Sequence, residues 1–453
     1  MLMHAASPRV ADIAAIRARE FARLSSRNEA YLDYAGAALY GASQIRRHQE
    51  LLDDGVFGNP HSEHQPSRES TAVIDAARDR VLRFFNVSAA THVVCFTANC
   101  TAAIKLVAES YPFGPECGLV LSADNHNSIN GIREYARRAG APAATLPLGA
   151  DLRLHDGESC LEHIPVSAGG LFAFPAQSNF SGVRHPLSLV RRAQRRGFRV
   201  LLDAAAFVPS AALDLNAYPA DYTVVSFYKV FGFPTGVGAL VARRDALAAL
   251  SRPWFAGGTV AYASVQHDTH RARLLHEGFE DGTVNFLGIA ALTAGFAFLD
   301  EISPAQAGAH ASALCAALVA KLSSLRHRNG RPIVALYGPE DRRDCGATVA
   351  FNLLDAHRMP IPYASVEARA RTANVSVRGG CFCNPGAAET AFHFDPVQTR
   401  HCFDTLGDGF TVERFARCLG AHIETGAIRA SLGLANVESD VYRLTDIVRS
   451  FRT

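Results

Sequence analysis

Lysine is scarce in this sequence of 453 residues. The chain has 45 lysine and arginine residues, but lysine occurs only at positions 105, 229 and 321. Arginine keeps its proton in proteins, so it cannot serve as a nucleophilic amine or as a base. Any chemistry that requires a lysine amine therefore has three candidates, Lys105, Lys229 and Lys321.

An excess of positive charge is also lacking, because the basic residues face 43 aspartates and glutamates and the net charge is +2. Such a chain has little charge to neutralise nucleic acid or an anionic membrane. No apolar run approaches the roughly 18 residues that suggest a membrane span. The N-terminal stretch carries Arg9, Arg17 and Arg19, which favours a helix over a signal peptide. We expect a soluble, cytoplasmic protein that binds neither nucleic acid nor membrane.

The ten cysteines form no CxxC pair. This spacing excludes a zinc ribbon and a thioredoxin motif. A chain of this size is also unlike the small secreted proteins that depend on disulfide bonds. No metal site is predicted.

Short apolar runs alternate with helical stretches between residues 91 and 242, and several runs are apolar almost throughout. This alternation predicts an α/β fold with a mostly parallel sheet and helices on both faces. Ligands of such sheets bind beyond the carboxyl ends of the strands. A smaller α+β region is expected to follow. The predicted strands of the large sheet are His92–Thr97, Gly118–Ala123, Gly170–Pro175, Arg199–Ala204, Asp221–Phe227 and Val237–Ala242.

Lys229 directly follows one of these strands, YTVVSF, and precedes a glycine-punctuated turn. At that edge of the sheet, desolvation can lower the pKa of the amine enough to make it a nucleophile and a base. The alternative is a surface lysine, an interpretation that also suits Lys105 and Lys321.

Asp203 ends the apolar strand RVLLD, one crossover unit before Lys229. A buried carboxylate is costly unless it is paired, and a protonated ring nitrogen over the sheet would be a suitable partner. The alternative role is a helix N-cap.

Small and hydroxyl residues fill the strand-to-helix turn FTANCTAAIK, among them Cys100 and Thr101. Backbone N–H groups at a helix N-terminus favour an anion, although an ordinary N-cap explains the same residues.

The segment VRGGCFCNPG places Cys381 and Cys383 on a glycine-rich loop beside Arg378. Nearby positive charge favours a reactive thiolate. The alternatives are a CxC metal site and structural cysteines.

Together these segments resemble the class V group of fold-type I pyridoxal-phosphate enzymes, the cysteine desulfurases and their relatives, and in particular the desulfurase domain of molybdenum cofactor sulfurases. The motifs occur in the same order as in the family, from Tyr31 to the AIRASLG stretch. The quoted segments are YLDYAGAALY, FGNPHS, FFNVSAATHVVCFTANCTAAIKLVAES, FAFPAQSNFSG, LLDAAAFVP, ADYTVVSFYKVFGFPTGVGALV, FEDGTVNF and GCFCNPGA.

The resemblance implies a pyridoxal 5'-phosphate cofactor and a role for each matching residue. Lys229 would bind the cofactor covalently, Asp203 would pair with its ring nitrogen, and His126 would stack on its ring. Cys383 would accept sulfur as a persulfide. The remaining implied residues are Asn179 near the phenolic oxygen and the substrate, Cys100, Thr101 and Ser226 at the phosphate, Thr283 donated to the phosphate by a neighbouring subunit, and Arg429 with Arg378 at the substrate.

The implied protein is a homodimeric cysteine desulfurase that converts L-cysteine to L-alanine and passes sulfur to a protein or small-molecule acceptor. The expected domains are an N-terminal segment packed on the small domain (1–60), a large cofactor-binding domain (61–310) and a small C-terminal domain with the Cys383 loop (311–453). Two alternatives stay open, another class V enzyme (a lyase, epimerase or aminotransferase) and a non-catalytic sulfur carrier or scaffold. The departures from the family pattern are Tyr228, Ala206 and Ala388.

Overall fold

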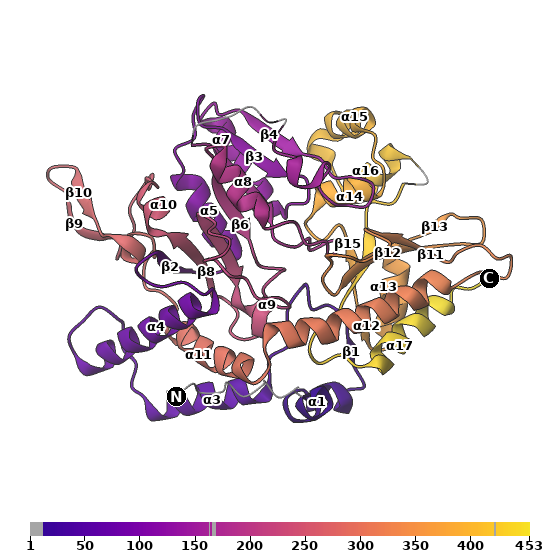
Figure 1. The fold of residues 1–453 in the computed structure, drawn as a ribbon, viewed down its shortest axis with the longest axis horizontal. Coiled ribbons are helices and arrows are strands. Elements are labelled where there is room, and N and C mark those ends of the chain that lie inside the picture. The colour runs from indigo at the N-terminus through magenta and orange to yellow at the C-terminus, as the bar shows by residue number, and fades with distance from the viewer. Residues whose placement is uncertain (1–11, 163, 165–168, 421–422) are drawn as a thin grey trace, which may run out of the picture.

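A seven-stranded sheet lies at the centre of the protein, with a smaller antiparallel sheet beside it (Figure 1). The computed structural model describes residues 12–162, 164, 169–420 and 423–453. The predicted N-terminal helix appears as α1 (Ile13–Glu20) and α2 (Ala22–Ser26), while its first part, residues 1–11, falls outside the described residues.

All six strands predicted for the large sheet are confirmed, with ends that differ by at most one residue. The β8 strand runs against its neighbours, and the other six strands share one direction. The β4 strand was not predicted, because it lies at the sheet's edge with exposed residues and lacks the apolar run of a buried strand. In spatial order the strands are β2 (His92–Thr97), β8 (Gly238–Arg243), β7 (Tyr222–Ser226), β6 (Arg199–Asp203), β5 (Leu171–Pro175), β3 (Leu119–Ser122) and β4 (Ala143–Leu146).

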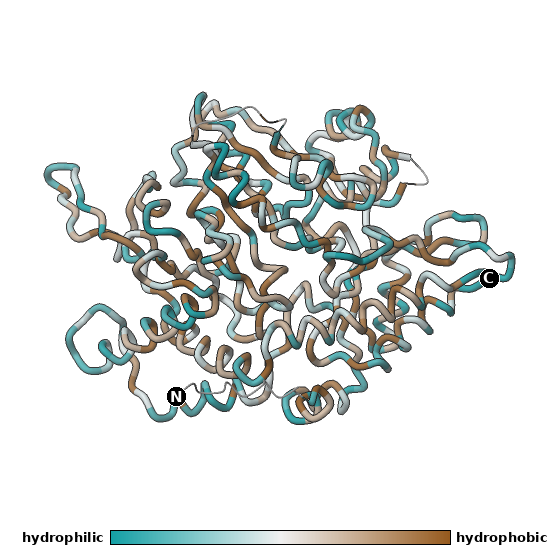
Figure 2. Tube along the Cα trace, viewed as in Figure 1, coloured by the Kyte–Doolittle hydropathy of each residue, from teal (hydrophilic) through white to brown (hydrophobic). Residues whose placement is uncertain are grey.

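Both faces of this sheet are buried, as the apolar runs require. Successive side chains of a strand point to opposite faces, so Phe172 and Phe174 of β5 join one core while Leu171 and Ala173 join the other. The predicted α/β architecture with helices on both faces is therefore confirmed. Figure 2 shows the hydrophobic strands enclosed by more polar helices. One core is covered by α4 (Gln65–Phe84), α8 (Ser188–Arg195), α9 (Phe227–Phe231), α11 (Phe286–Glu301) and α14 (Pro385–Ala391), and the other by α5 (Cys100–Ser110), α6 (Asn127–Asn130), α7 (Ile132–Arg138) and α10 (Arg244–Ala248).

The smaller sheet is antiparallel and forms a third core with three helices. The N-terminal segment reaches this region, since β1 (Ala30–Tyr31) pairs with β14 (Val375–Ser376). The expected domain limits stay predictions, and the limit at residue 310 falls inside α12. The elements are β11 (Val334–Tyr337), β12 (Thr348–Leu354), β13 (Pro360–Ile361), β15 (Arg378–Gly380), β16 (Ala427–Ser431), α12 (Pro304–Ser324), α13 (Tyr363–Thr372) and α17 (Glu438–Arg449).

The remaining elements lie at the periphery. A disulfide joins Cys402 and Cys418 of two neighbouring helices, a pairing that the sequence analysis did not predict. The β9–β10 hairpin projects from the body at the left of Figure 1. These elements are α3 (Ala42–Asp54), β9 (Val260–Ser264), β10 (Thr269–Ala272), α15 (Pro396–Leu406), α16 (Val412–Leu419) and the 3₁₀ turns Gly157–Ser159, Leu275–Gly278 and Gly407–Gly409.

Within the described ranges, no single helix has the length and hydropathy to cross a membrane. Only α11 and α12 taken together, with a 66° bend between them, meet those two criteria.

Gly232, which ends α9, offers a test of how the N-terminal segment packs on the large domain. Its φ is +80°, and a Cβ there would lie 2.3 Å from the Tyr40 backbone nitrogen. Gly140 has a similar φ of +67° but open space around it. We expect Gly140→Ala to cost about 1–2 kcal/mol, from backbone strain alone, and Gly232→Ala to cost clearly more. Thermal unfolding midpoints of the two variants measure this difference, and equal midpoints would contradict the described packing.

Candidate active site

A cavity of about 320 Å³ opens at the carboxyl edge of the large sheet. Ligand pockets in proteins commonly reach this size. The strand ends meet here because β5, β6 and β7 are parallel and in register, with Asp203 opposite Val224. The cavity brings together most of the predicted site residues: Cys100, Thr101, His126, Asn179, Asp203, Ser226 and Lys229.

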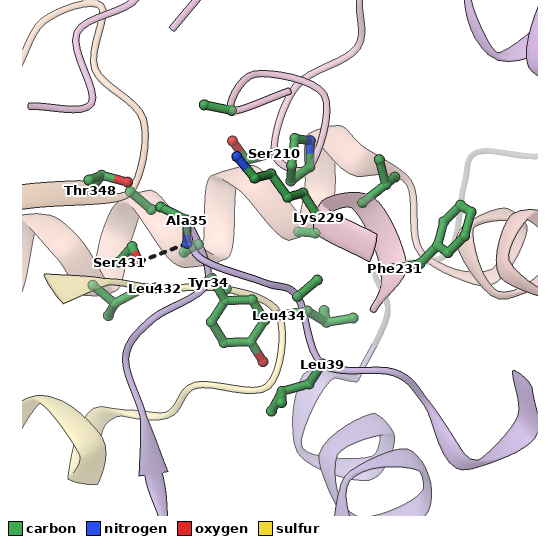
Figure 3. Close-up of a pocket in the computed structure, with 18 of the residues that line it drawn as sticks. Tyr34, Ala35, Leu39, Ser210, Lys229, Phe231, Thr348, Ser431, Leu432 and Leu434 are labelled. Carbon is green, nitrogen blue, oxygen red and sulfur yellow. Dashed lines mark hydrogen bonds between the residues drawn. The ribbon is translucent and has the colours of Figure 1, made fainter. Parts of the chain in front are cut away.

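Lys229 is the lysine at this edge of the sheet. Lys105 instead pairs with Glu109 on the surface of α5, and Lys321 lies over the ring of Tyr442. Lys229 also borders a second, smaller cavity of about 70 Å³ (Figure 3). That cavity is lined mainly by apolar side chains, which include Leu39 and Leu434. Lys229 thus lines both the cavity at the sheet edge and this smaller apolar cavity.

Asp203 is 9% exposed and ends β6 under the cavity. Its Oδ1 accepts the backbone N–H of Ala205 at 2.9 Å and lies 3.8 Å from the Cys100 sulfur. A carboxylate so deeply placed favours a cationic partner. Asp203, the predicted partner of a cofactor's ring nitrogen, therefore lies where a ring bound in the cavity could reach it.

Cys100 was predicted at a phosphate, but its side chain contacts Asp203. Burial, and then the negative charge of Asp203, raise the pKa of the Cys100 thiol well above its ordinary value. The group therefore stays a neutral thiol that donates to Asp203. Its backbone N–H donates to Ser226 Oγ at 2.8 Å, which fixes the start of α5 against the end of β7.

The start of α5 retains the features of an anion site. Asn99 caps the helix by accepting the Ala102 N–H, and Thr101 Oγ1 lies 2.8 Å from Ser128 Oγ. Ser128 in turn donates its backbone N–H to His126 Nδ1 at 3.1 Å. Helix N–H groups and two hydroxyls suit a phosphate group. Ser128 was missed as a site residue, although it lies only two residues after His126.

His126 is half-buried beside Lys229 and Asp203. Desolvation, and then the positive charge of Lys229, lower the pKa of its imidazole below the ordinary value. The shift favours the neutral imidazole.

The Cys383 loop lies next to the cavity. Among the described residues, none from this loop lines the cavity. The thiol of Cys383 is exposed. The preceding residue, Phe382, accepts a hydrogen bond through its carbonyl from Asn179 Nδ2 at 2.7 Å. Asn179 thus belongs to the cavity and also holds the loop.

Arg429 and Arg378 share one carboxylate, that of Asp33. Arg429 is 2% exposed and donates to Asp33 Oδ1 at 2.9 Å and to the Asn179 carbonyl at 3.0 Å. Arg378, half exposed, donates through Nη2 to Asp33 Oδ2 at 2.5 Å. Burial lowers the pKa of Arg429, whereas the hydrogen bond to Asp33 raises that of Arg378. Asp33 was not predicted, although it is the only acidic residue of the YLDYAGAALY motif.

Thr283 does not reach the Lys229 cavity within one chain. It lines a neighbouring cavity of about 380 Å³, and its hydroxyl lies 3.4 Å from Asn59 Nδ2. As for metals, the described ranges contain no group of three or more His, Cys, Asp and Glu side chains able to hold an ion.

The residues that line the Lys229 cavity of about 320 Å³ fit pyridoxal phosphate. An amine, a buried carboxylate, a neutral imidazole and a helix N-terminus match its aldehyde, ring nitrogen, ring face and phosphate in turn. The fit depends on these four groups, and each follows or ends a different strand.

Comparison with known proteins gives the family. The family model described as Aminotransferase class-V matches residues 30–444. The chain belongs to the aminotransferase class-V family. It is 37% identical to molybdenum cofactor sulfurase 3 of Aedes aegypti, over 95% of this chain and 57% of that protein. It is 34% identical to the molybdenum cofactor sulfurase of Arabidopsis thaliana, over 97% of this chain and 58% of that protein. The chain thus spans somewhat more than half the length of these relatives.

Solved structures of similar fold include cysteine desulfurases. An apo cysteine desulfurase from Thermococcus onnurineus superposes with a TM-score of 0.80 at 22% identity, covering 98% of each chain. The S-sulfonic acid form of the Escherichia coli desulfurase CsdA gives 0.77 at 23% identity, covering 98% of this chain and 99% of that one. A C-DES variant with glycine covalently linked to its pyridoxal phosphate cofactor gives 0.71 at 18%, covering 96% and 98%. The predicted class V fold is confirmed.

The lowered pKa of His126 predicts a pH dependence. An unfolded histidine titrates near pH 6.5, so below about that pH the unfolded chain takes up a proton that folded His126 resists. The stability that this group contributes is present above about pH 6.5 and is lost as the pH falls below it. NMR titration, with the His126 signal assigned through His126→Asn, should give a midpoint below 6.5. A midpoint at or above that value would contradict the described burial.

Proposed function

We propose that this class V protein is a pyridoxal-phosphate-dependent cysteine desulfurase, which moves the sulfur of L-cysteine to Cys383 and releases L-alanine. The observation that carries the proposal is the arrangement around Asn179. This residue lines the cavity of Lys229 and Asp203, and its amide binds the loop of Cys383. Family membership supports the same cofactor and chemistry.

The cofactor would be held at four points of the cavity. Lys229 would bind its aldehyde carbon, Asp203 its ring nitrogen and His126 its ring face, while the start of α5 with Thr101 would bind the phosphate. Bound there, pyridoxal phosphate supplies an electron sink for the charge that develops at the substrate Cα. The Asp203 carboxylate strengthens that sink by keeping the ring nitrogen protonated.

The chain's own residues supply the remaining chemistry. Arg429 would bind the substrate carboxylate, for which its planar fork is suited. The Lys229 amine carries protons to and from the substrate carbons. The Cys383 thiolate forms a bond to the substrate sulfur as the carbon–sulfur bond breaks. The electron pair stays on the three-carbon fragment, which takes up a proton and leaves as alanine, so no external oxidant or reductant is consumed.

The persulfide on Cys383 would then pass sulfur to an acceptor. The exposed position of Cys383 supports transfer to a partner at the surface. The names of the relatives in Aedes aegypti and Arabidopsis thaliana make a molybdenum cofactor one candidate acceptor. The expected cytoplasmic location stays a prediction.

Replacing the sulfur acceptor tests the proposal directly. Cys383→Ala should keep the yellow colour of the bound cofactor, because the thiol lies outside the cavity, and should form neither persulfide nor alanine from L-cysteine. Mass spectrometry after a single addition of L-cysteine measures the added sulfur. Cys345→Ala, which removes another partly exposed thiol, is the matched control and should behave as the unaltered protein. Full turnover by Cys383→Ala would favour the alternative of a C–S lyase.

We also propose a homodimer in which Thr283 completes the phosphate site of the neighbouring subunit. Its position on a cavity next to that of Lys229 supports this arrangement. Light scattering should then give twice the 48.6 kDa chain mass. Loss of a hydrogen bond to a phosphate in Thr283→Ala should weaken cofactor retention about 10-fold or more. Thr372→Ala, at an exposed helix end, is the control. A monomer with unchanged retention in Thr283→Ala would contradict the proposal.

A further inference from the structure

The backbone of the Cys383 loop has an unusual conformation. Phe382 and Cys383 both have positive φ values, 58° and 57°. Residues with side chains seldom adopt this left-handed conformation, and two in succession persist only where surrounding contacts impose it. The loop between β15 and α14 must therefore be held by interactions with the rest of the protein.

Two hydrogen bonds hold the tip of the loop from outside. The Cys383 carbonyl accepts the Asn127 backbone N–H at 2.7 Å, and the Phe382 carbonyl accepts from Asn179 at the same distance. Both donors belong to the large domain. They leave the Cys383 thiol exposed while fixing the peptide groups on either side of it.

Asn384, the next residue, connects this loop to the interior. Its side chain is fully buried. Its amide nitrogen donates to Asp124 Oδ1 at 2.7 Å and to Asn179 Oδ1 at 3.0 Å, and its amide oxygen accepts the Ala387 N–H at 3.2 Å. The orientation of the Asn384 amide therefore also sets the orientation of the Asn179 amide, which holds Phe382.

Asp124 lies beneath Asn384 as a buried carboxylate with no part in the chemistry proposed above. It is 1% exposed, and Ser178 Oγ and Asn384 both contact its Oδ1 at 2.7 Å. His185 Nε2, on an equally buried ring, lies 2.8 Å from Oδ2. Because the Asp124 Oδ1 accepts from the Asn384 amide nitrogen, the Asn384 amide points its N–H groups toward this carboxyl group.

We propose that Asp124 is a positioning residue for Cys383, acting through Asn384 and Asn179 to fix the loop beside the cavity. This inference rests on the proposed function for its catalytic readout. Its physical basis is a chain of hydrogen bonds from Asp124 to the Phe382 carbonyl in which every group has one possible orientation. The thiol then meets the substrate sulfur from a preformed position.

The test uses full-length holoenzyme with Asp124→Asn, which keeps the side chain's shape but lets an N–H face Asn384. The change of the cofactor absorbance on adding L-cysteine should still occur, since Lys229, Asp203 and His126 are unaltered. The rate of persulfide formation on Cys383 should fall about 10- to 100-fold, as small displacements of reacting groups do. Hydrogen exchange in residues 377–386 should become faster.

Asn352→Ala is the matched control. It removes another buried amide, on β12, that donates to the Gly426 carbonyl at 3.1 Å, so it should lower the melting temperature without altering persulfide formation. Should Asp124→Asn fail to fold, Ser178→Ala removes one donor to the same carboxylate and should give a smaller loss in the same direction.

The outcomes separate the two proposals. An unchanged persulfide rate and unchanged exchange in Asp124→Asn would overturn the role of Asp124. If the unaltered protein forms no persulfide at all, the proposed function fails, and faster exchange confined to residues 377–386 still supports the positioning role. Faster exchange spread over the whole chain in Asp124→Asn, as in Asn352→Ala, would mean a general loss of stability and would overturn it.

Discussion

The common direction of β5, β6 and β7 is the constraint on which the site depends. Parallel strands in register end at one edge, so the residues that follow them are neighbours although they lie far apart in the chain. Asp203 ends one strand, and Lys229 follows the next by less than one helical turn. Apolar cores cover both faces of the sheet, and the carboxylate and the amine line one cavity at its edge.

A second constraint joins the two sheets. Asp33 of the N-terminal segment binds Arg429, whose guanidinium donates to the Asn179 carbonyl. The Asn179 side chain continues to Asn384 and from there to Asp124. Most of this chain is excluded from water, where a polar group without a partner is costly. Displacing one member therefore leaves the next without its hydrogen-bond partner. Arg429 at the small sheet is thereby coupled to the Cys383 loop.

The same arrangement suits the proposed sulfur chemistry. The cavity supplies the general requirements of class V proteins, an amine, a carboxylate and an anion site. Cys383, the proposed sulfur acceptor, lies apart from them on a loop whose backbone is held by hydrogen bonds and whose thiol is exposed. In the proposed reaction, this separation would let one thiol serve both the cavity and an external acceptor.

The sequence by itself determined the strands of the large sheet, because runs such as LFAFP and RVLLD are apolar on both faces and have no other stable place. It also determined the candidates for chemistry, since a chain with three lysines has only one, Lys229, after a buried strand. Motif resemblance added His126 and selected Cys383 from the two cysteines of its loop. The edge strand β4 was missed, because an exposed strand carries no comparable apolar signal.

Only the tertiary structure decided how polar side chains pair. Cys100 contacts Asp203, Asp33 joins Arg378 to Arg429, and Asp124 holds Asn384, although the partners in each pair lie at least a hundred residues apart in the chain. A motif shows that a polar residue is present. Its partner depends on which strand ends and loops the packed sheets bring within hydrogen-bonding distance, and that distance exists only in the folded chain.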